Sequence, residues 1–122
     1  MSIRNRHLMD FCQRIRTEML KQCDRVYLRE AEEKKTFPYV VFDVRALTDV
    51  RVTLELDLWG TRPGEKTLAD LADNLEEALD GLAISEPEFI AALYTNNDLK
   101  WVNDDDKDIK HVNLSFTATY QA

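Results

Sequence analysis

The chain has 122 residues, of which 44% are apolar and 32% are charged, a composition typical of one globular domain. Its 23 acidic and 16 basic side chains give a net charge of −7, which disfavours general binding to nucleic acid, because phosphates require a basic surface. No apolar run approaches the ~18 residues of a membrane span. The first residues, MSIRNRHLMDF, lack the apolar core of a secretory signal. We therefore expect a cytoplasmic protein without a membrane partner.

The N-terminal region predicts one long amphipathic helix, from about residue 4 to residue 33, since apolar side chains recur every three or four positions. The apolar stripe consists of Leu8, Phe11, Cys12, Ile15, Met19, Cys23 and Val26. The charged residues 29–35 either continue this helix or form a linker. Cys12 and Cys23 would share one helix face about 16 Å apart, too far for a disulfide, so both are expected as free thiols.

The charge is unevenly distributed between the two parts of the chain. Residues 1–35 carry nine Lys or Arg against six Asp or Glu, a net +3, whereas residues 36–122 carry seven against seventeen, a net −10. A basic end and an acidic body could associate between copies of the chain.

Two segments with alternating apolar and polar residues, YVVFDVRAL (39–47) and RVTLELDLW (51–59), predict a β-hairpin. The expected inward side chains are Val40, Phe42, Val44, Ala46, Val52, Leu54, Leu56 and Leu58. The same alternation places Tyr39, Val41 and Trp59 on the otherwise polar face. We therefore expect that something covers part of this face.

A second amphipathic helix is predicted from about residue 65 to residue 82, with an apolar stripe that includes Leu68, Leu71, Leu75 and Leu79. Residues 89–95 fit a strand better than a helix, residues 98–103 form a weaker strand, and residues 109–120 alternate clearly. The predicted fold is a single α+β domain. Residues 1–35 form the long helix, and residues 36–122 form a mainly antiparallel sheet with a crossover helix packed on one face.

Three aspartates, Asp104, Asp106 and Asp108, have the spacing at which a calcium loop begins. The pattern then fails, because Ile109 stands where a glycine is needed and Ser115 where a bidentate glutamate is needed. We expect an exposed turn between two strands, with no tightly bound ion; weak binding of an ion stays open.

Catalytic and cofactor motifs are not found in the sequence. His7 and His111 are far apart, both cysteines lie on an apolar stripe, and neither a nucleophile-elbow motif nor a glycine-rich phosphate loop occurs. We therefore predict a protein that is not an enzyme, with no catalytic residue, metal or cofactor.

The order of four segments resembles a known family: FPYVVFDV (37–44), LELDLWG (54–60), TLADLADNLEEALDGL (67–82) and DDDKDIKHVNLSFTATYQA (104–122). It is similar to the tail terminator, or tail-to-head joining, proteins of long-tailed bacteriophages and prophages. The resemblance implies a structural protein that forms a hexameric ring, caps the tail tube and meets a head-completion protein. It also implies assembly in the host cytoplasm and a final place at the head–tail junction of the virion.

The candidate interaction surface consists of Arg14, Arg16, Arg25, Tyr39, Val41 and Trp59. Two other classes of function stay open from the sequence. One is a cytosolic dimeric binding or regulatory module without catalytic activity, and the other is a metal-dependent phosphate-handling enzyme that uses the aspartate cluster.

Overall fold

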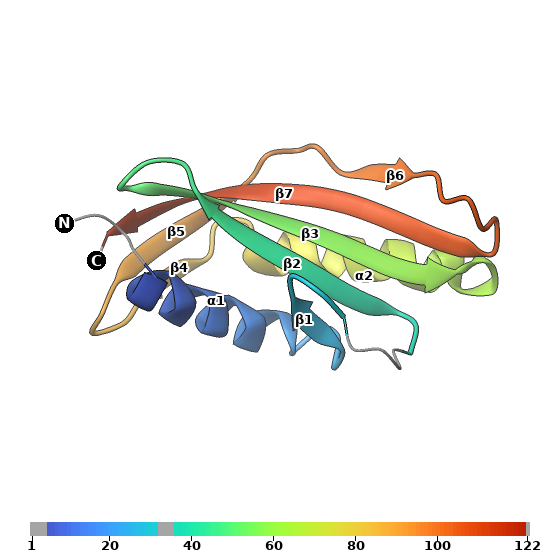
Figure 1. The fold of residues 1–122 in the computed structure, drawn as a ribbon, viewed down its shortest axis with the longest axis horizontal. Coiled ribbons are helices and arrows are strands. Elements are labelled where there is room, and N and C mark those ends of the chain that lie inside the picture. Colours follow the sequence, from blue (N-terminus) through green and yellow to red (C-terminus); the bar gives the residue numbers. More distant parts are fainter. Residues whose placement is uncertain (1–4, 32–35, 122) are drawn as a thin grey trace.

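The computed structural model describes residues 5–31 and 36–121, in which two helices pack against a curved β-sheet (Figure 1). The helices are α1 (Asn5–Met19) and α2 (Glu65–Leu79), the latter preceded by a 3-10 turn, η1 (Arg62–Gly64). The long strands are β2 (Tyr39–Ala46), β3 (Arg51–Thr61), β5 (Ile90–Thr95) and β7 (Ile109–Gln121). The short strands are β1 (Val26–Leu28), β4 (Ala83–Ser85) and β6 (Lys100–Val102).

The strands of the sheet lie in the order β1-β2-β3-β7-β5-β4, and β6 pairs with the N-terminal part of β7. Only the β1–β2 pair is parallel among the described strands; the other pairs are antiparallel. The predicted mainly antiparallel α+β sheet is thus confirmed. In its register, Tyr39 lies opposite Trp59, and Trp59 lies opposite His111.

Both helices cover the same face of the sheet, where the core forms. The predicted inward residues of the hairpin are buried except Ala46, which is exposed because β2 ends there, next to the hairpin turn. The predicted stripe residues of α2 are buried. Phe11 of α1 packs edge-on against Phe89 and Tyr120, with ring centroids 6.0 and 5.7 Å apart. The second amphipathic helix and its packing on one face are therefore confirmed.

The predicted helix over residues 4–33 is wrong in its extent, since α1 ends at Met19 and β1 follows from Val26. The spacing of Met19, Cys23 and Val26 fits a helical stripe, and all three side chains are buried. However, Met19 ends α1, Cys23 lies in the connecting segment, and Val26 begins β1. The segment VYL favours a strand, and pairing with β2 satisfies its backbone, which a sequence pattern cannot anticipate. Residues 29–31 are not helical, and residues 32–35 lie outside the described residues.

The C-terminal end of α2 depends on Gly81, whose φ of +79° is a left-handed conformation that favours glycine. Its backbone N–H donates a hydrogen bond to the carbonyl of Leu93 on β5. The helix therefore stops slightly before the predicted residue 82 and the chain enters β4. Neither helix of the described chain has the length and hydrophobicity needed to cross a membrane.

Candidate interaction surface

An aromatic row crosses three strands on the open face of the sheet, which is the face that the helices leave uncovered. The row consists of Tyr39 on β2, Trp59 on β3 and His111 on β7, which the register places side by side. The rings of Tyr39 and Trp59 stack with centroids 6.3 Å apart, and those of Trp59 and His111 stack at 3.8 Å with an interplanar angle of 13°. The three rings thus form one stacked row across the sheet, in which Trp59 and His111 are half-buried.

His111 also contacts a carboxylate, because its Nε2 lies 2.6 Å from Oδ1 of Asp57 on β3. The amide of Asn113 donates hydrogen bonds to the same oxygen of Asp57, at 2.9 Å, and to Glu55, at 3.0 Å. These contacts fix the imidazole over the indole of Trp59. Alternation along residues 109–120 is enough to put His111 on the face opposite Val112, but it cannot reveal the partners of the imidazole, since they depend on strand register.

The sequence predicts Tyr39 on the candidate interaction surface, but its side chain is only 5% exposed. Burial raises the pKa of the Tyr39 phenol, with smaller contributions from Asp104 and Tyr27. Val41 and Trp59 are half-buried. Alternation gives the face of a side chain but not its depth, because neighbouring rings, here Phe37 and Tyr27, cover Tyr39.

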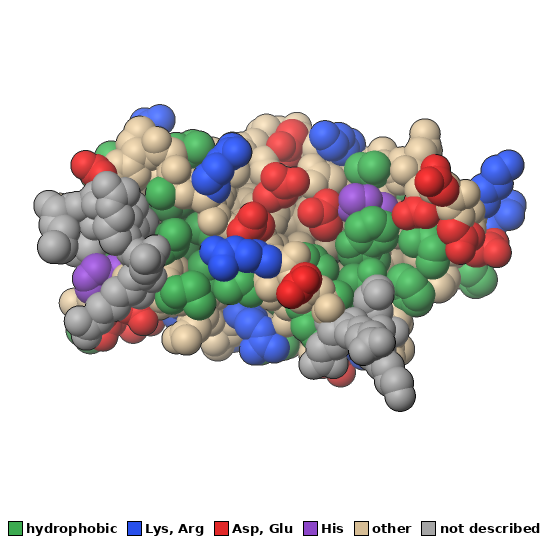
Figure 2. Space-filling model, in the orientation of Figure 1, with side chains coloured by type: hydrophobic (Ala, Val, Ile, Leu, Met, Phe, Trp, Pro, Cys, Tyr) green, Lys and Arg blue, Asp and Glu red, His purple; other side chains and the backbone are tan. Residues whose placement is uncertain are grey.

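A shallow pocket of about 390 Å³ opens over the aromatic row. Its wall includes Arg29 and Ala31 after β1, and its floor includes Val41, Trp59 and His111. A hydrophobic area lies beside a histidine on this face of the molecule (Figure 2). The pocket can therefore receive an apolar or cationic side chain of a partner.

A carboxylate row lies next to the aromatic row, and acidic side chains gather along the middle of the open face in Figure 2. Asp43 and Glu55 are direct cross-strand partners, an arrangement of like charges that destabilises a sheet. Arg29 compensates part of this repulsion through Nε, 3.2 Å from Oδ1 of Asp43. The carboxylate of Asp98 accepts two hydrogen bonds from Ser115, one from its backbone N–H and one from its hydroxyl.

The three predicted arginines lie away from this face, and each has an intramolecular partner. Arg14 donates hydrogen bonds to Glu18 and, at 3.1 Å, to Glu86. The hydrogen bond with Glu18 raises the pKa of Arg14 and lowers the pKa of Glu18. Arg16 donates to the carbonyl of Val26 at 2.9 Å. The structure thus groups Tyr39, Val41 and Trp59, and it holds Arg14 and Arg16 in contacts made by α1.

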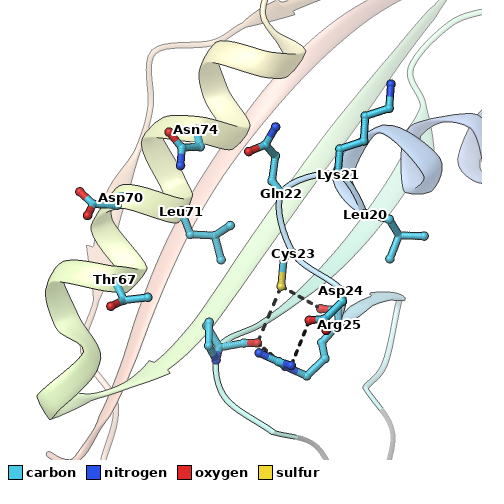
Figure 3. Close-up of a pocket in the computed structure, with 11 residues that line it drawn as sticks. Leu20, Lys21, Gln22, Cys23, Asp24, Arg25, Thr67, Asp70, Leu71 and Asn74 are labelled. Atoms are coloured by element: carbon cyan, nitrogen blue, oxygen red, sulfur yellow. Dashed lines mark hydrogen bonds and ion pairs between the residues drawn. The ribbon is translucent and has the colours of Figure 1, made fainter.

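Arg25 lines a second pocket, of about 520 Å³, between the segment after α1 and α2 (Figure 3). Its Nε donates to the carbonyl of Pro38 at 2.9 Å, and the Cys23 Sγ lies 3.8 Å from the same oxygen. Asp70 and Asn74 of α2 line the opposite wall. These contacts hold the chain together between α1 and β2, and they form no nucleophile–base pair.

The aspartate cluster forms the turn between β6 and β7, as predicted. Asp104 Oδ1 accepts the backbone N–H of Asp106, and Asp106 Oδ1 accepts that of Asp108, each at 2.9 Å. The carboxylates therefore serve as turn acceptors. Within residues 5–31 and 36–121, no group of three His, Cys, Asp or Glu side chains is arranged to hold a metal ion.

The sheet carries helices on one face and a stacked aromatic row on the other, and comparisons with known proteins specify the class of protein. Residues 16–121 match the family of tail completion protein gp17. The chain belongs to this family, which confirms the predicted resemblance and gives it a structural role in a phage-type tail. A comparison of the sequence with curated proteins finds no match.

A solved structure shares the fold of the chain. It is a chain of the virion of a native gene transfer agent (GTA) particle, 13% identical, with a TM-score of 0.69. The alignment covers 88% of this chain and 92% of that one. At this identity the similarity concerns the fold.

Proposed function

We propose that this chain is a tail terminator, which caps the finished tail tube as a ring of identical subunits and joins the tail to the head. The observation that carries the proposal is the open face of the sheet, which presents stacked aromatic rings and carboxylates in a member of a tail completion family. Aromatic side chains with a polar rim are typical of protein interfaces.

The proposed partners are other copies of this chain, the tail tube protein and a head-completion protein. The protein would assemble in the host cytoplasm and remain at the head–tail junction. Its contribution is binding, and the proposal assigns it no catalytic step.

The test is complementation of particles produced without this protein. Purified protein is added to isolated tail tubes, and binding to tube ends is measured by co-sedimentation and electron microscopy. The proposal predicts that the protein binds tube ends and restores joining of tails to heads. A Trp59→Ala variant should bind less, and a Lys66→Ala variant, changed on the outer side of α2, should bind as the unmodified protein does.

A mass measurement in solution and on tubes distinguishes the alternative of a dimeric regulatory module. A dimer in solution, with no binding to tube ends when tubes are added, would favour the regulatory module and contradict the terminator. A closed ring on the tube end would support the proposal.

A further inference from the structure

The two ends of the β2–β3 hairpin have opposite character, and together they form a complementary pair. We propose that the hairpin tip of one copy of this chain docks into the aromatic pocket on the open face of the next copy. The hairpin tip is defined as residues 45–51. This inference rests on the proposed function, because it specifies how copies in the ring contact one another.

The hairpin tip is apolar and basic. Leu47 and Val50 are 48% and 56% exposed, although both are large apolar side chains. Arg45 and Arg51 flank them and are also exposed, with Asp49 as the one acid of the tip. Exposed apolar side chains between two cations form a surface that favours an apolar, acidic partner.

The tip has a defined conformation, so little ordering is required when it binds. The backbone N–H of Leu47 donates to the carbonyl of Arg51 at 2.8 Å, which closes the hairpin. The carbonyl of Val50 accepts the backbone N–H of Tyr120 on β7, also at 2.8 Å. An interface element held in place before binding loses less conformational entropy.

The opposite end of the hairpin offers the matching features. The aromatic row and Val41 supply an apolar floor, and the pocket has room for one or two side chains. Asp57 lines the pocket, and Asp43 and Glu55 lie on the same face nearer the middle of the hairpin. Arg29 offsets part of the charge of Asp43, and a cation from another copy would relieve the remaining repulsion between Asp43 and Glu55.

The placement of the two features explains why the partner is a second copy. β2 separates Tyr39 from Ala46 by seven residue steps, roughly 23 Å along the strand. A tip therefore cannot reach the pocket of its own chain. A contact between the tip of one copy and the pocket of the next leaves a free tip and a free pocket, so the contact repeats until a ring closes.

The test introduces cysteines at both ends of the contact, with the two native cysteines buried. Val50→Cys places a thiol on the tip, and Val41→Cys places one in the pocket. After mild oxidation, free protein and protein on tail tubes are examined by denaturing gels. A mixture of the two single variants should give cross-linked dimers, and the double variant should give a ladder of larger oligomers. The inference would be overturned if the mixture gave no cross-link in either setting. It would also be overturned if the Val50→Cys variant alone formed cross-linked dimers through its introduced thiol.

Charge reversal tests the electrostatic part of the contact. Arg45→Glu with Arg51→Glu should reduce cross-linking at least tenfold, and Asp43→Lys with Glu55→Lys on the other copy should restore it. Lys21→Glu with Lys66→Glu is the matched control, since it changes net charge equally on the helix side of the molecule. Equal loss in this control, or no loss in the arginine variant, would contradict the inference.

The outcomes separate this inference from the proposed function. If the arginine variant still forms rings on tube ends, the tip–pocket contact is wrong and the terminator function stands. If the double cysteine variant gives the cross-linked ladder and the unmodified protein binds no tube end, the contact stands and the terminator function is wrong.

Discussion

The imidazole of His111 stacks on the indole of Trp59 at a centroid distance of 3.8 Å. These residues are 52 positions apart in the chain and meet because β3 and β7 are neighbours in register. Trp59→Ala should therefore remove the centre of the aromatic row, with a stability cost of about 1–3 kcal/mol and a loss of binding to tube ends.

His111→Phe is the complementary change, because it keeps a ring on Trp59 and removes the contact with Asp57. We expect binding nearer to that of the unmodified protein than to that of Trp59→Ala. Stability is measured by urea unfolding and binding by co-sedimentation. Equal binding by Trp59→Ala and the unmodified protein would contradict a role for the aromatic row.

The core prediction concerns Leu56 on β3 and Leu75 on α2, both fully buried between sheet and helix. Leu56→Ala or Leu75→Ala should lower the free energy of unfolding by about 2–5 kcal/mol, since each leaves a cavity. Leu47→Ala at the exposed hairpin tip should change it by less than about 0.5 kcal/mol. Urea unfolding of the three variants checks this, and a large effect of Leu47→Ala would show that the tip is packed in the monomer.

The aspartate turn gives a prediction about ions. Changing Asp104, Asp106 and Asp108 together to Asn should leave the melting temperature nearly unchanged, because the amide oxygen of Asn can accept the same backbone N–H groups. The same three positions changed to Ala should destabilise the turn, since those acceptors are lost. A large rise in the melting temperature of the unmodified protein on adding calcium would contradict the prediction that no ion is tightly bound.

Alkaline pH should destabilise the fold through two buried groups. Burial raises the pKa of the Cys12 thiol from 9.0 to about 11 and that of the Tyr120 phenol from 10.0 to about 12. Between pH 9 and 12 the unfolded chain loses these protons before the folded protein does, so the free energy of unfolding falls as pH rises.

The comparison for this effect is Tyr120→Phe, which keeps the ring and removes a hydroxyl that has no hydrogen-bond partner among the described residues. Urea unfolding from pH 8 to pH 11.5 should show a shallower decline for this variant. An identical decline would assign the alkaline effect to other groups.

The Arg14–Glu18 pair gives the opposite pH dependence. Hydrogen bonding to Arg14 lowers the pKa of Glu18 below its ordinary value of 4.5. The resulting stabilisation is fully present above that value and is lost as pH falls through the lower, folded-state pKa. Glu18→Gln should therefore reduce the acid-side decline in stability measured from pH 7 to pH 3, and Glu77→Gln, on the outer side of α2, should leave it unchanged.

The sequence by itself determined the faces of the long elements. Alternation in β2, β3 and β7 and the 3.6-residue period in α2 depend on side-chain direction alone, so Leu56 and Leu75 could be placed in the core before any contact was known. The turn at residues 104–108 and the tail completion family could also be predicted, because both depend on local residue order.

Only the tertiary structure decided where α1 ends, since Cys23 and Val26 fit an apolar stripe of either a helix or a strand. It also decided which side chains meet across strands. Register depends on pairing between segments far apart in sequence, so the stacking of His111 on Trp59 and the opposition of Asp43 and Glu55 have no local signal. Burial of Tyr39 has the same cause, because it is neighbouring rings, and not alternation, that cover a side chain on an open sheet face.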